Sequence, residues 1–119
     1  MIAEIQQLGL SAPNSFLASD EATLAMITGG CGPGKFGDAL VPDTMYGLSI
    51  KLACAIHDYE YYIGKTNEDK RIADLNFLGN MMIIINKKTS TPWMKLLRYH
   101  RAMTYYTAVA EGGDSFFKN

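Results

Sequence analysis

A short break at residues 64–66 separates two long stretches of this sequence that both carry helical patterning. The first stretch covers residues 47–63 and is stopped by Gly64. The second follows Thr66 or Asn67, either of which can cap a helix, and continues to about residue 87. Because so short a connection keeps two helices adjacent, we expect them to pack antiparallel.

Three further helices are expected, each bounded by residues that start or stop helices: 2–8, 20–28 and 92–112. Ser19 is expected to cap the second of these, and Pro92 to open the third after Thr91. Residues 11–15 are expected to form a linker, and residues 33–46 to be irregular because they contain two prolines and two glycines.

The length of 119 residues and the apolar content of 48% are enough for one hydrophobic core. We therefore predict a single all-α domain over residues 1–119, with two long antiparallel helices, a glycine-rich loop and flanking helices. A net charge of −1 without a cluster of Lys or Arg argues against nucleic-acid binding. The longest apolar run, residues 81–85, is too short to span a bilayer. The first residues lack the features of a signal peptide.

The loop GGCGPGKFG at residues 29–37 resembles a phosphate-binding P-loop, but two features exclude this interpretation. Phe36 occupies the position where a P-loop needs Ser or Thr, and the loop follows a predicted helix instead of a strand. Alternating Gly30, Gly32 and Gly34 would instead allow several backbone carbonyls to turn toward a hard cation such as calcium. A simple helix C-cap followed by a turn would explain Gly29 and Gly30, but not Gly32 and Gly34.

One face of the first long helix carries Cys54, His57, Asp58 and Tyr61, all within about 100° around the helix axis. Asp58 is positioned to add a charged ligand to a cation held by the glycine loop. The alternative interpretation is that His57 is a hydrogen-bonded core histidine and that Asp58 is solvated.

Asp74 falls on the predicted core stripe of the second long helix, which comprises Phe77, Leu78, Met81 and Ile85. A buried aspartate is costly unless a donor meets it, and antiparallel packing would place His57 opposite. Such a carboxylate fixes the imidazole tautomer and leaves the other ring nitrogen as a base. Since no Ser or Cys is evidently placed as a nucleophile, water is the expected one. The alternative is a structural hydrogen bond from Tyr61 to Asp74 without catalysis.

These motifs resemble the secreted phospholipase A2 superfamily. The similarity consists of Cys31-Gly32-Pro33-Gly34 in the loop, Cys54-x-x-His57-Asp58-x-x-Tyr61 in the first helix and Ala73-Asp74 in the second. It covers about residues 29–87, and the Gly-Pro-Gly form is similar to the phospholipase domain of parvovirus capsid proteins.

The resemblance implies calcium-dependent hydrolysis of the sn-2 ester of glycerophospholipids at a membrane or micelle surface. His57 would be the general base, Asp74 would orient it and Tyr61 would support the carboxylate. The amide of Gly32 would donate to the oxyanion. The calcium ligands would be Asp58 and the carbonyls of Gly30, Gly32 and Gly34.

The two cysteines, Cys31 and Cys54, could form one disulfide or be two free thiols, and their number alone does not decide between these. The resemblance implies a Cys31–Cys54 disulfide, which would tie the loop to the first helix. The chain departs from the family in having only two cysteines, and Glu60 stands where many members have another. Residues 35–46 form a longer connection than usual. The resemblance implies an extracytoplasmic destination, either secreted or associated with a virion or phage. The lack of signal-peptide features fits a viral, phage or bacterial effector product better than an animal secreted enzyme.

Two alternatives stay open. A non-catalytic helical module for interaction or structure would keep the same helix pair without hydrolysis. A metal phosphohydrolase of the His-Asp type needs further histidines, and only His100 remains. We expect His100 to pack in the core together with the apolar residues that share its stripe: Leu96, Tyr99, Met103 and Tyr106.

Overall fold

The structure is a computed structural model that describes residues 1–27 and 41–112. Its elements follow one another in this order: α1 (Ile2–Leu8), α2 (Asn14–Leu17), α3 (Glu21–Ile27), β1 (Thr44–Met45), β2 (Leu48–Ser49), α4 (Lys51–Ile63), α5 (Asn67–Lys88) and α6 (Pro92–Gly112). The predicted all-α class is confirmed, because helices dominate and β1 with β2 forms the one small sheet of the described chain.

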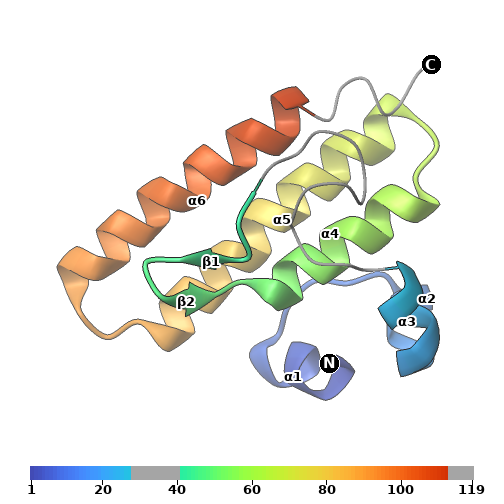
Figure 1. Ribbon diagram of the computed structural model, residues 1–119, viewed down its shortest axis with the longest axis horizontal. Helices are drawn as coiled ribbons and strands as arrows, with labels where there is room; N and C mark the ends of the chain where they lie inside the picture. Colours follow the sequence, from blue (N-terminus) through green and yellow to red (C-terminus); the bar gives the residue numbers. More distant parts are fainter. Residues whose placement is uncertain (28–40, 113–119) are drawn as a thin grey trace.

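The three long helices lie side by side, with α5 between α4 and α6 (Figure 1). The turn between α4 and α5 makes these two helices antiparallel, as the sequence predicted. Thr66 caps α5: its hydroxyl accepts from the Asp69 amide at 3.1 Å, while the Asp69 carboxylate accepts from the Thr66 amide at 3.3 Å. This capping box satisfies amides that the helix itself leaves without partners, and it explains why α5 begins at Asn67.

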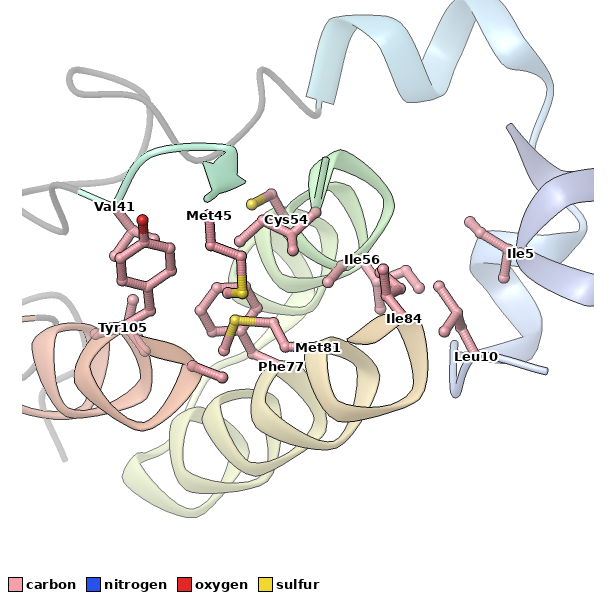
Figure 2. Packing of buried hydrophobic residues seen from close by; sticks show 14 of the residues in the cluster. Ile5, Leu10, Val41, Met45, Cys54, Ile56, Phe77, Met81, Ile84 and Tyr105 are labelled. Carbon is pink, nitrogen blue, oxygen red and sulfur yellow. The ribbon is translucent and has the colours of Figure 1, made fainter. Parts of the chain in front are cut away.

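The hydrophobic core lies between α4 and α5 and extends toward α6 and the N-terminal helices. Figure 2 shows Met45 from β1 beside Phe77 and Met81 from α5, with Tyr105 of α6 nearby. The predicted core stripe of α5 is largely confirmed, because Phe77, Met81 and Ile85 are fully buried. Leu78 only packs against the edge of the cluster.

The hairpin of β1 and β2 lies where the sequence predicted irregular structure followed by the start of a helix. Residues 44–46 were expected to be irregular and residues 47–50 to be helical, but α4 begins only at Lys51. Tyr46 and Gly47 both have positive φ, at 45° and 79°, as a type I′ hairpin turn requires. Tyr46 is an unusual residue for this conformation. Contacts from α6 support it, since Arg98 donates to the Tyr46 carbonyl at 2.6 Å and Arg101 to its hydroxyl at 2.8 Å.

The N-terminal region also differs from prediction. The expected linker at 11–15 gives way to α2 from Asn14, because Phe16 is buried and meets the Tyr59 ring of α4 edge-on at 5.2 Å. The cap of α3 is Asp20 and not Ser19, since Asp20 accepts from the Thr23 amide at 2.7 Å. The local sequence allows more than one start for each of these two helices. The burial of Phe16 and the hydrogen bond to Asp20 decide between them.

The expectation for His100 was wrong, because the side chain is exposed. The apolar pattern of α6 contains two stripes, and the one that packs inward is Ala102, Tyr105 and Val109. The stripe with His100 is covered only in part: Leu96 is 70% and Met103 45% exposed, whereas Tyr99 packs against the core. Trp93, at the start of the helix, is 62% exposed. Within the described residues, no helix combines the length and apolarity that crossing a membrane demands.

Candidate active site

The carboxylate of Asp74 is the centre of a buried polar cluster between α4 and α5. Its Oδ1 lies 2.8 Å from Nε2 of His57 and accepts from the Tyr61 hydroxyl at 2.6 Å. Its Oδ2 accepts from the ammonium of Lys70 at 2.7 Å. Asp74 is 2% exposed, and these donors are what make its burial tolerable. The predicted contact of His57 and Tyr61 with Asp74 is therefore present.

The helical spacing explains why these side chains meet. His57 and Tyr61 are four residues apart on α4, and Lys70 and Asp74 are four apart on α5, so each pair occupies one face of its helix. The ring of His57 also contacts two aromatic rings, with centroids at 4.3 Å for Tyr61 and 4.6 Å for Phe77. The imidazole is thus held by packing as well as by hydrogen bonding.

The electrostatics of the cluster favour an ionised Asp74 beside a neutral His57. Desolvation acts to raise the pKa of Asp74, but hydrogen bonds from His57, Lys70 and Tyr61 outweigh it, and this pKa lies below its usual value. Burial lowers the pKa of His57, against the opposing effect of Asp74. An ionised carboxylate can only accept, so Nε2 of His57 carries the proton and Nδ1 of the neutral ring keeps a free lone pair.

Asp58 occupies the same helix and is also buried, at 7% exposure. A buried carboxylate one residue from His57 is the type of oxygen ligand that suits a hard cation. The other predicted ligands, the carbonyls of Gly30, Gly32 and Gly34, lie outside the described residues, as does the predicted oxyanion donor Gly32. Over residues 1–27 and 41–112, no three His, Cys, Asp or Glu side chains gather into a metal site.

Cys54 is fully buried on α4, one turn before Asp58, and is not a free thiol. Its predicted partner, Cys31, lies outside the described residues. The Cys31–Cys54 pairing therefore stays a prediction.

Lys70 is the residue of this cluster that sequence reasoning missed. Its side chain is 5% exposed, although lysine is rarely buried without a partner. The sequence does contain a signal, because Asp74 falls on the predicted core stripe and Lys70 precedes it by one helical turn on the same face. Its ammonium also donates to the Ala110 carbonyl of α6 at 2.9 Å, a contact that no local pattern indicates.

Glu60 lies on α4 beside this cluster and bonds to Asn76, whose amide donates to Oε2 at 2.8 Å. Its Oε1 is buried without a hydrogen-bond partner in the described part of the chain. Desolvation raises the pKa of Glu60 from 4.5 to about 7, with Asn76 opposing and Asp74 adding to the shift. Because the folded state holds this proton more tightly than the unfolded state, stability should fall as pH rises between these two values.

Replacing Glu60 with Gln should remove this pH dependence. We expect the variant to exceed the wild type in unfolding free energy at pH 8 by on the order of 1–2 kcal/mol, after a discount for partial solvent screening. Urea denaturation at pH 5 and pH 8 measures the effect, with Glu4→Gln on the exposed face of α1 as the control. Parallel pH dependence in Glu60→Gln and the wild type would contradict the assignment.

Comparisons with known proteins give no indication of function, so the function is inferred from the geometry of the site. No protein-family model matches this chain, and the searches of curated proteins and of solved structures found no match either.

Proposed function

We propose that this chain is a phospholipase A2-like enzyme that hydrolyses the sn-2 ester of glycerophospholipids in a calcium-dependent reaction. The observation that carries the proposal is the buried hydrogen bond between His57 Nε2 and Asp74 Oδ1, with Tyr61 on the same oxygen. A phospholipase A2-like arrangement of the two long helices belongs to the same proposal.

The chemistry follows from the lone pair on His57 Nδ1. This nitrogen accepts a proton from water as the water oxygen bonds to the ester carbonyl carbon. When the tetrahedral intermediate collapses, the bond to the glycerol oxygen breaks and the proton passes to that oxygen. The products are a fatty acid and a lysophospholipid. Asp74 holds the tautomer and stabilises the imidazolium that forms transiently.

Asp58 would hold calcium together with the carbonyls of Gly30, Gly32 and Gly34. The carboxylate fits this role because it is buried and supplies the hard oxygen donor that calcium prefers. Bound calcium supplies polarisation of the ester carbonyl and neutralisation of developing charge. The proposed setting is a phospholipid membrane or micelle surface, and the proposed destination is extracytoplasmic, secreted or associated with a virion or phage.

Hydrolysis of mixed micelles tests the proposal directly. A phospholipid labelled in the sn-2 acyl chain should release labelled fatty acid in calcium buffer, and excess chelator should stop the release. A substrate labelled in the sn-1 chain is the positional control. No release from either substrate in calcium would contradict the proposal.

Replacing Asp58 with Asn should weaken calcium binding more than it weakens folding, because a charged ligand is lost while the side-chain volume is kept. Calorimetric titration with calcium, next to a thermal melt, measures the two effects. Asp43→Asn makes the same chemical change at a partly exposed position before β1. An unchanged calcium affinity in Asp58→Asn would remove Asp58 from the ligand set.

A non-catalytic helical module is the second candidate function. It is favoured by the contact of Lys70 with both Asp74 and Ala110, because a buried polar link between α5 and α6 has a structural use without catalysis. Calcium-independent melting together with no lipid hydrolysis would favour this candidate.

A further inference from the structure

The contacts of Lys70 connect the catalytic carboxylate to a third helix. Its ammonium lies 2.7 Å from Asp74 Oδ2 and 2.9 Å from the Ala110 carbonyl, near the C-terminal end of α6. Both the ammonium and the carboxylate are almost fully buried. The cation is therefore held between a charged acceptor on its own helix and a backbone acceptor on the neighbouring one.

The two oxygens of Asp74 have different partners, and this division orients the group. Oδ1 faces His57 and Tyr61, whereas Oδ2 faces Lys70. A carboxylate bonded through one oxygen only can rotate about its terminal torsion, which is broad for aspartate. The charge-assisted bond to Oδ2 removes that freedom, and charged hydrogen bonds of this kind are about twice as strong as neutral ones.

We propose that Lys70 is a positioning residue that clamps Asp74 Oδ2 against the end of α6, directs Oδ1 at His57 Nε2 and so selects the Nε2–H tautomer of His57. Lys70 does not itself meet substrate. The consequence for turnover rests on the proposed function, whereas the consequence for the tautomer does not.

Three variants test the proposal. Lys70→Met keeps the length of the side chain and removes the ammonium, and Lys70→Arg restores a cation. Lys87→Met is the matched control, because Lys87 is an exposed lysine of the same helix whose ammonium also donates to a backbone carbonyl, that of Leu8, at 2.6 Å. The chain has two histidines, and exposed His100 is an internal reference for ¹⁵N-histidine NMR.

In the wild type and in Lys87→Met, the NMR spectrum should show His57 as one tautomer, protonated at Nε2. In Lys70→Met, we expect a mixture of His57 tautomers. We also expect kcat to fall about 10-fold with little change in KM, which is the typical effect of losing a group that orients a residue of the site by a hydrogen bond. Lys70→Arg should recover most of both properties.

A Lys70→Met variant with the wild-type His57 tautomer and wild-type kcat would overturn the proposal. So would a Lys70→Arg variant that folds but matches Lys70→Met in both measurements, since the effect would then come from packing and not from charge. If the wild type hydrolyses no phospholipid, the proposed function fails, and the NMR comparison still decides the role of Lys70.

Discussion

Replacing His57 with Gln should lower phospholipid hydrolysis by roughly 10²–10⁴-fold, the usual contribution of a general base. The glutamine amide can still donate to Asp74 Oδ1, and its size suits the space between the Tyr61 and Phe77 rings. The fold should therefore survive. What the amide lacks is a lone pair of sufficient basicity to accept a proton from water near neutral pH.

Turnover on mixed micelles measures the loss, with thermal melting and calcium titration showing that the protein is otherwise intact. His100→Gln makes the same substitution at the exposed histidine of α6 and should retain full activity. Equal turnover in His57→Gln and the wild type would contradict the assignment of His57 as the general base and, with it, the proposed mechanism.

Replacing Asp74 with Asn should destabilise the fold by about 3 kcal/mol, because the buried ammonium of Lys70 loses its countercharge. The asparagine side-chain oxygen can still accept hydrogen bonds from His57 and Tyr61. The loss of stability therefore measures mainly the ion pair between Lys70 and Asp74. Turnover should also fall, since a neutral amide does not stabilise the imidazolium of His57. Calcium affinity should be spared, because Asp74 is not a proposed ligand.

Urea denaturation of a double-mutant cycle separates these effects. Combining Lys70→Met with Asp74→Asn removes both charges, and replacing a buried pair by less polar groups is often close to neutral. The double variant should therefore be more stable than Asp74→Asn alone. Additive losses across the cycle would show that the two side chains do not stabilise each other.

Several features of the fold were predictable because they depend on local chemistry. The start of α5 follows from the cap at Thr66, which depends on residues within one turn. Pro92 opens α6 because it needs no amide partner in the first turn. The meeting of His57, Tyr61 and Asp74 was also predictable, since helical periodicity and a short turn bring their faces together.

Other features depend on contacts between residues far apart in the sequence. The hairpin at 44–49 escaped prediction because Tyr46-Gly47 is not the usual turn pair, and Arg98 and Arg101 of α6 support its conformation. The inward face of α6 could not be chosen from its pattern, because the stripe with His100 is as apolar as the stripe that packs.

The sequence by itself determined the helical class, the antiparallel pair and the hydrogen bond between imidazole and carboxylate, because helix periodicity and capping act over a few residues. Only the tertiary structure decided that Lys70 is buried as a partner of Asp74 and that Ala110 accepts its second hydrogen bond. A lysine at a helix surface is solvated by default. It becomes part of a site only when another helix covers it and supplies an acceptor, which is a property of packing.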